Sequence, residues 1–254
     1  MTLRSLAAAA LLGVASLAPA ARAQAPAEHV AIGDRERAGN PASALRHYEA
    51  ALSADARNYE ALHKASAAAI DAGEAAPDAA RRTALYKSGE QYARRAVEAN
   101  PGHAEGHFAL ARALGRTAQS VGSRERVKYA ADVRTHALEA LRIDPRHPGA
   151  LHVMGMWNAE IMRLSGVTRF MAKNFLGGKV FDSASWDEAQ RYLEQAVAVE
   201  PDKLVHRVDL AEIYADRKNT AKAREQVDFV LKAPAAEAND AKYKRQAEAL
   251  AKRL

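Results

Sequence analysis

The sequence contains no cysteine. This absence excludes disulfide frameworks, thiol nucleophiles, cysteine-based zinc sites, iron–sulfur clusters and a lipoprotein anchor, which needs a lipidated cysteine. Glycine and proline are scarce, at 14 and 9 of 254 residues, which excludes collagen-like and low-complexity chains, and 48% hydrophobic residues exclude a disordered one. A chain of this length and composition can bury a core without disulfides or metals.

Long apolar runs are also missing. After the first 25 residues, no stretch approaches the roughly 18 consecutive apolar residues that a membrane-spanning helix needs. At the N-terminus, Arg4 precedes a short apolar run from Leu6 to Leu17, and small residues follow it. This pattern predicts a signal peptide over residues 1–23 that is cleaved after Ala23. We therefore expect a periplasmic or secreted protein.

Positive charge is in mild excess, with a formal net charge of +6. Proteins that bind nucleic acid usually concentrate lysine and arginine on one face. Here acidic and basic residues are interspersed, as in ARRTALYKSGEQYARRAVE at residues 80–98. We therefore expect no nucleic-acid partner.

A short phrase recurs along the chain. The copies AVEANP, ALRIDP and AVAVEP end at Pro101, Pro145 and Pro201, and a weaker copy ends at Ala56. Each copy finishes an amphipathic segment, and proline cannot continue a helix. The phrase therefore marks helix ends, and the chain is predicted to consist of helix pairs without any strand.

The first helix of each predicted pair has a fixed register. An expected packing position is followed, three residues later, by an apolar residue and then by a small one, which allows two helices to cross closely. The packing positions are Leu62, His107, Leu151 and Arg207; the apolar residues are Ala65, Leu110, Met154 and Leu210; the small residues are Ser66, Ala111, Gly155 and Ala211.

This register resembles the tetratricopeptide repeat, with its W-x2-L-G-x2-Y, A-x3-F, A and P pattern. The resemblance implies an all-α fold, a tetratricopeptide-type α-solenoid in which helix pairs form a right-handed superhelix. It covers residues 28–234, with most repeats longer than the usual 34 residues, and the superhelix is expected over residues 24–236. Residues 237–254 are expected to form a C-terminal capping helix, which a solenoid requires at its end.

The fourth repeat carries an insert at residues 163–184 and has a more particular resemblance. It is similar to the regulator of microtubule dynamics family in Gly155, Trp157, Phe170, Ala172, Phe175, Gly177, Ser185, Glu188 and Ala189. Eukaryotic members of that family are associated with microtubules, membrane contact sites and lipid binding. For an exported chain, the resemblance implies the fold, a binding-module role and the lipid hypothesis.

The inner face of such a solenoid is lined by side chains of the first helices. These side chains come one residue after each packing position and one residue after each small residue. Val208 and Glu212 are also expected there. The predicted ligand groove comprises His63, Phe108, Arg112, Arg116, His152, Met156 and Glu160. This mixture of aromatic, apolar and charged side chains can hold a peptide or an amphipathic ligand. The alternative is an ordinary solvated surface, and both interpretations stay open.

The insert has its own apolar stripe. Val167 begins this stripe, which continues through the predicted contact residues, and basic residues surround it. The predicted insert contacts are Phe170, Met171, Phe175, Arg169 and Lys173. A basic amphipathic helix can lie on an anionic membrane or cover a lipid pocket, but it can also pack over its own repeat.

Metal and catalytic motifs are weak. His103 and His107 have the four-residue spacing of zinc ligands, yet no H-E-x-x-H motif is present, and His107 falls at a packing position. The Gly177-Gly178-Lys179 segment lacks the remaining residues of a phosphate-binding loop. We therefore expect no metal, no cofactor and no enzyme activity. The sequence favours an exported, non-catalytic scaffold that binds a protein or peptide; the alternative is a lipid-binding or lipid-shuttling protein.

Overall fold

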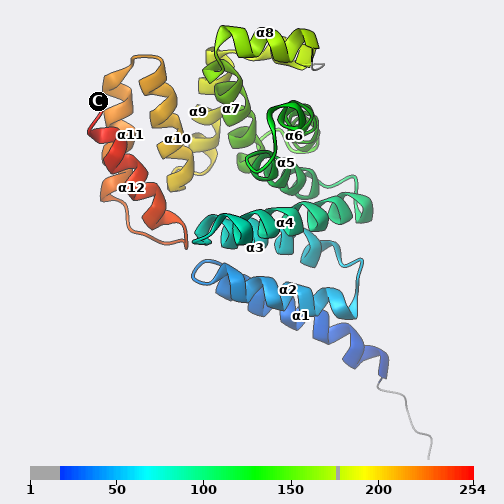
Figure 1. Cartoon of the computed structure of the whole chain (residues 1–254). Helices are drawn as coiled ribbons and strands as arrows, with labels where there is room; N and C mark the ends of the chain where they lie inside the picture. Colours follow the sequence, from blue (N-terminus) through cyan, green and yellow to red (C-terminus); the bar gives the residue numbers. More distant parts are fainter. Residues whose placement is uncertain (1–17, 176–177) are drawn as a thin grey trace, which may run out of the picture.

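The computed structural model describes residues 18–175 and 178–254, with side chains outside the described set at 18–25, 123–124 and 171–179. Within these ranges the chain is helical and contains no strand (Figure 1). The elements are α1 (Ala18–Arg37), α2 (Pro41–Ala54), α3 (Tyr59–Ala75), α4 (Ala79–Ala99), α5 (Ala104–Ala118), α6 (Ser123–Ile143), α7 (Pro148–Arg163), α8 (Gly166–Phe175), η1 (Gly178–Ser183), α9 (Trp186–Val199), α10 (Leu204–Asp216), α11 (Thr220–Lys232) and α12 (Asp240–Ala251). The predicted all-α solenoid is confirmed.

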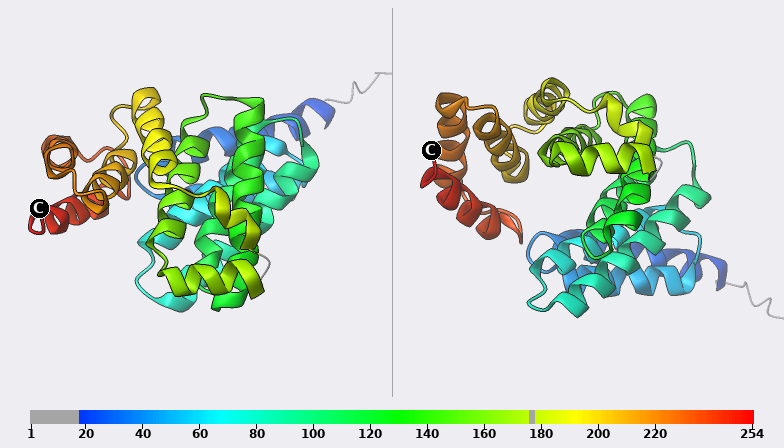
Figure 2. Two further views of the ribbon diagram at one scale, coloured as in Figure 1. Left: turned by 90° about the horizontal axis from the view of Figure 1, so that it is seen from above. Right: turned by 45° about the horizontal axis from the view of Figure 1, so that its top comes forward.

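Consecutive helices pack as antiparallel pairs, namely α1 with α2, α3 with α4, α5 with α6, α7 with α9, and α10 with α11. The pairs follow one another along an arc (Figures 1 and 2). The first helices of successive pairs are neighbours, from α1 through α3, α5 and α7 to α10, and α12 lies against α10 and α11. We call the side of the arc lined by these first helices the inner face.

Helix ends follow the predicted punctuation. α4 ends two residues before Pro101, α6 two residues before Pro145, and α9 two residues before Pro201. Side-chain caps start several of the helices; for example, the Ser185 hydroxyl accepts a hydrogen bond of 3.1 Å from the Glu188 amide at the start of α9. Since α4 and α6 each have 21 residues, they absorb much of the extra repeat length.

The predicted register places the core correctly in α3, α5 and α7. All four apolar positions and the small residues that follow them are buried. In α10 the prediction is wrong by one residue at the packing position Arg207 and at the inner-face position Val208. Val208 is buried, whereas the Arg207 guanidinium lies 3.6 Å from the ring centre of Phe229. This cation–π contact holds the arginine at the edge of the core.

The insert forms α8 and η1. The Phe181 ring of η1 is buried with its centroid 6.2 Å from that of Trp157, so η1 anchors the insert to the α7 pair. α8 packs mainly against η1, and its Val167 and Phe170 side chains are 76% and 60% exposed. The predicted contacts Met171, Lys173 and Phe175 lie in α8, but their side chains are outside the described set.

The N-terminal segment is described only in part. α1 begins at Ala18, inside the predicted signal peptide, and residues 1–17 lie outside the described ranges. Among the helices that the structure describes, none has the length and apolar character needed to cross a bilayer.

Candidate functional site

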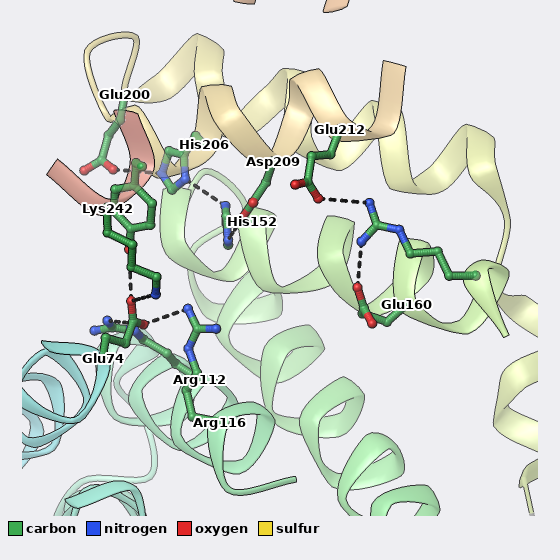
Figure 3. A network of polar contacts seen from close by, with 12 residues as sticks. Glu74, Arg112, Arg116, His152, Glu160, Glu200, His206, Asp209, Glu212 and Lys242 are labelled. Carbon is green, nitrogen blue, oxygen red and sulfur yellow. Dashed lines mark hydrogen bonds and ion pairs between the residues drawn. The ribbon is translucent and has the colours of Figure 1, made fainter. Parts of the chain in front are cut away.

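The predicted groove residues come from three consecutive first helices, with His63 on α3, Phe108 and the two arginines on α5, and the remainder on α7. All of them are half-buried except Glu160, which is exposed. Most are partnered within the chain. Phe108 lies against the His147 ring at a centroid distance of 4.7 Å, and His63 lies against Tyr59 at 5.1 Å. The charged members form the polar network drawn in Figure 3.

Glu74 is the centre of that network. Its side chain is 0% exposed, although it sits at the end of α3. One carboxylate oxygen lies 2.7 Å from Arg116 Nη2, and the other lies 3.1 Å from Lys242 Nζ and accepts a hydrogen bond of 3.2 Å from the Tyr243 hydroxyl. Arg112 Nη2 is 3.6 Å away. Burial favours a raised pKa for Glu74, but Arg116, Arg112 and Lys242 outweigh it and lower the pKa.

Asp71 extends the network by one helical turn. Its carboxylate accepts hydrogen bonds from Arg112, at 2.6 Å, and from Arg37 of α1, at 3.1 Å. Burial acts to raise the pKa of Asp71, and the two guanidinium groups reverse this and lower it. Ionised Asp71 and Glu74 thus tie α1, α3, α5 and α12 together at the inner face.

His152 of α7 meets His206 of α10, with 2.9 Å between the two Nδ1 atoms. His206 Nε2 donates to Glu200 at 3.1 Å, so a neutral His206 has its acceptor lone pair on Nδ1. His152 Nδ1 then donates to it, while His152 Nε2 lies 3.2 Å from Asp209. The two histidines thus join α7 to α10 at the inner face.

A further cluster lies near the other end of α7. Arg163 pairs with Glu160 at 2.6 Å, with Asp216 at 2.8 Å and with Glu212 at 3.4 Å. Burial, assisted by Asp209, raises the pKa of Glu212. This part of the inner face therefore carries more acidic than basic groups, in contrast to the arginine-rich surroundings of Glu74 (Figure 3).

The histidines with zinc-like spacing serve as structural groups. His103 Nδ1 accepts a hydrogen bond of 3.3 Å from the Glu105 amide and so caps α5. His107 is buried, with Nε2 2.9 Å from the Pro101 carbonyl oxygen and Nδ1 3.0 Å from His136 Nδ1. Among the side chains that the structure describes, no three His, Asp or Glu groups are arranged to hold a metal ion.

Buried imidazoles make stability depend on pH. Burial lowers the pKa of both His63 and His206 from 6.5 to about 4. In the unfolded chain these two imidazoles bind protons below pH 6.5, whereas in the folded chain they stay neutral until the pH approaches 4. The stability that is present above pH 6.5 is therefore lost as the pH falls toward 4, by about 1.4 kcal/mol for each unit of pKa difference. We expect the urea midpoint to fall through this window. A His63→Gln, His206→Gln double variant should show a flatter dependence; an equally steep one would contradict the assignment.

Sequence reasoning missed half of the network. Arg112, Arg116 and His152 were found from helix register, but their partners Glu74 and His206 were not. No local pattern marks Glu74 or His206 as a partner. Lys242, which also contacts Glu74, is 168 residues away in the sequence, and the position of Lys242 follows only from the curvature of the whole arc.

Comparison with known proteins agrees with this architecture. A model of the family described as regulator of microtubule dynamics protein 1-3 matches residues 30–254. The Bos taurus regulator of microtubule dynamics protein 1 is 24% identical over 111 residues, which cover 44% of this chain and 34% of the bovine protein, so the aligned part spans about a third of that relative.

Two solved structures are similar along most of their length. A thermophilic TPR protein of Thermus thermophilus has a TM-score of 0.65 at 21% identity, with 89% of this chain and 99% of that chain covered. The pilF protein of Pseudomonas aeruginosa has a TM-score of 0.50 at 14% identity, with 92% and 87% covered. These likenesses show the tetratricopeptide fold.

Proposed function

Since the chain belongs to the regulator of microtubule dynamics family, we propose that it is a non-catalytic binding module that takes a protein or peptide segment along its inner face. The observation that carries this proposal is the composition of that face. Partly exposed charged groups of both signs lie on rigid neighbouring helices, with half-buried Met156 one turn from both His152 and Glu160. Concave solenoid surfaces of this kind suit extended or helical segments.

The two charged regions differ in sign, which suggests the character of the partner. Arg37, Arg112, Arg116 and Lys242 surround two carboxylates, while Arg163 faces three carboxylates of its own. A segment that carries both acidic and basic side chains matches this arrangement. Because most of these groups are only partly exposed, ion pairs with a partner would be screened less than on an open surface.

A random peptide library selected on the immobilised protein tests the proposal. For the selected peptides, Glu160→Lys should weaken binding about tenfold, which corresponds to ~1.4 kcal/mol for reversing one charge at the contact. The matched control is Glu98→Lys, because Glu98 is an exposed residue of α4, a second helix. Equal losses in the two variants, or failure of any peptide to bind the folded protein, would refute an inner-face site.

We also propose export to the periplasm or to the outside of the cell, from the Arg4–apolar–small pattern of the N-terminus. N-terminal sequencing of the protein from its own cells should then begin at Gln24. A chain that starts at its first methionine would contradict export by this route.

One observation favours a second function, binding of lipid or an anionic membrane surface. Val167 and Phe170 are large apolar side chains with most of their surface exposed, and Arg169 lies beside them on α8. Sedimentation with anionic liposomes tests this function. Replacing Arg169 and Lys173 with Glu should weaken association by more than about 1 kcal/mol per residue, in a salt-dependent way.

The matched control for the liposome experiment is the Arg81→Glu, Lys87→Glu variant, because both residues are exposed on α4. If the insert variant and this control lose the same affinity, the effect is one of net charge and not of α8. If the unchanged protein ignores anionic liposomes and carries no lipid when purified, the lipid function is eliminated.

A further inference from the structure

The C-terminal helix reaches back across the arc to α3. Its first turn and the residue before it supply three contacts. Lys242 and Tyr243 meet the Glu74 carboxylate, and the Asn239 amide lies 3.5 Å from the backbone carbonyl oxygen of Asp71. These groups are 168 or 169 residues apart in the sequence, and Figure 1 shows the start of α12 beside the end of α3.

Apart from these contacts with α3, α12 packs in the C-terminal part of the arc. Tyr243, Ala247 and Leu250 are buried in an apolar cluster with residues of α10 and α11, including Val208 and Val227. By contrast, the contacts of Asn239, Lys242 and Tyr243 with α3 are polar. α12 is therefore held to α10 and α11 by apolar packing and to α3 by hydrogen bonds and an ion pair.

The polar contact can separate without leaving a stranded charge. When Lys242 leaves, the Glu74 carboxylate keeps its partners Arg116 and Arg112, which belong to the same half of the arc. The Lys242 side chain is already 35% exposed and can return to water at its own end. An ion pair with these properties is easily exchanged, unlike one in which both charges would remain buried and unpaired.

We propose that Asn239, Lys242 and Tyr243 form, with Asp71 and Glu74, a clasp that holds the two parts of the arc together and whose release opens the inner face to a partner. This inference rests on the proposed function, since it concerns access to the same face. Arg112 and Arg116 link the clasp to that face, because both contact Glu74 and both lie on α5. A bound segment with an acidic side chain can instead pair with Lys242, which leaves Glu74 to Arg112 and Arg116 and releases the clasp.

The absence of cysteine makes a distance measurement direct. Ala80 on α4 and Ala249 on α12 are exposed, so each can be replaced by a spin-labelled cysteine in the full chain. Pulsed electron paramagnetic resonance should give a narrow distance distribution in the otherwise unchanged protein. Lys242→Glu places a second carboxylate beside Glu74 and should broaden the distribution and shift it to longer distances.

The matched control is Arg245→Glu, which makes the same change of charge at an exposed position three residues further along α12. It should leave the distribution unchanged. A Lys242→Met, Tyr243→Phe variant removes the charge and the hydroxyl without burying a new charge, and this variant should also open the clasp. Circular dichroism verifies that each variant remains folded.

If neither clasp variant changes the distance distribution, the clasp is refuted. Because this measurement uses no ligand, that result would leave the inner-face peptide site standing. Conversely, a clasp that opens in a protein that binds no selected peptide would refute the proposed function and leave the conformational change established.

Discussion

Replacing Gly155 with leucine is expected to lower the free energy of unfolding by several kcal/mol, on the order of 3, because the side chain overpacks a close helix crossing. Gly155 lies in α7, where a Cβ atom would collide with Leu193 Cδ2 and lie 3.1 Å from the Ala189 carbonyl oxygen. The backbone oxygen cannot move without displacing α9. Chemical denaturation measures the loss.

The matched control is Gly115→Ala in α5. A Cβ there would have Val133 Cγ2 at 3.9 Å, an ordinary contact. Alanine is a better helix former than glycine by roughly 1 kcal/mol, so this variant should be as stable as the parent or more so. An unchanged unfolding midpoint in Gly155→Leu would contradict the α7–α9 packing described above.

Replacing Glu74 with glutamine should also be strongly destabilising, by about 3 kcal/mol or more, because it breaks a buried ion pair and leaves Arg116 without its counter-charge. The Glu74 side chain is fully buried, and Arg112 and Arg116 are only 20% and 28% exposed. The effect should be largest near neutral pH, where the carboxylate, with its lowered pKa, is ionised. Urea unfolding measures it.

An exposed pair of the same kind provides the comparison. Glu139 pairs with Arg142 at 2.7 Å, but that arginine is 69% exposed, and surface pairs contribute little to stability. Glu139→Gln should therefore change the unfolding free energy little. If Glu74→Gln were equally mild, Glu74 would not organise the inner face.

The sequence was sufficient to predict the fold because helix pairs repeat a local pattern. The end-marking phrase and the apolar–small register both depend on residues close in the sequence. The phrase closes α4, α6 and α9, and the register is found in α3, α5 and α7. In α10 the inner-face prediction failed at Val208, where Arg207 packs on Phe229 and exchanges roles with its neighbour. The resemblance to the regulator of microtubule dynamics family is confirmed by the family match over residues 30–254.

The polar network was only half predictable. Register alone places Arg112, Arg116 and His152 at the inner face, since each helix turns by a fixed angle per residue. Their partners depend on how far the arc curves, because the curvature brings Lys242 of α12 to Glu74. Small rotations between successive pairs accumulate along a solenoid, and a pattern within one repeat does not specify their sum.

The methyl resonances of the methionines test the central claim, inner-face binding, most directly. The chain has five methionines, with Met156 at the inner face and Met171 in α8. In a protein labelled with ¹³C at the methionine methyl groups, a selected peptide should shift the Met156 resonance and leave that of Met171 in place. A peptide that binds without moving Met156 would contradict inner-face binding, and a response of Met171 alone to anionic vesicles would favour the lipid function.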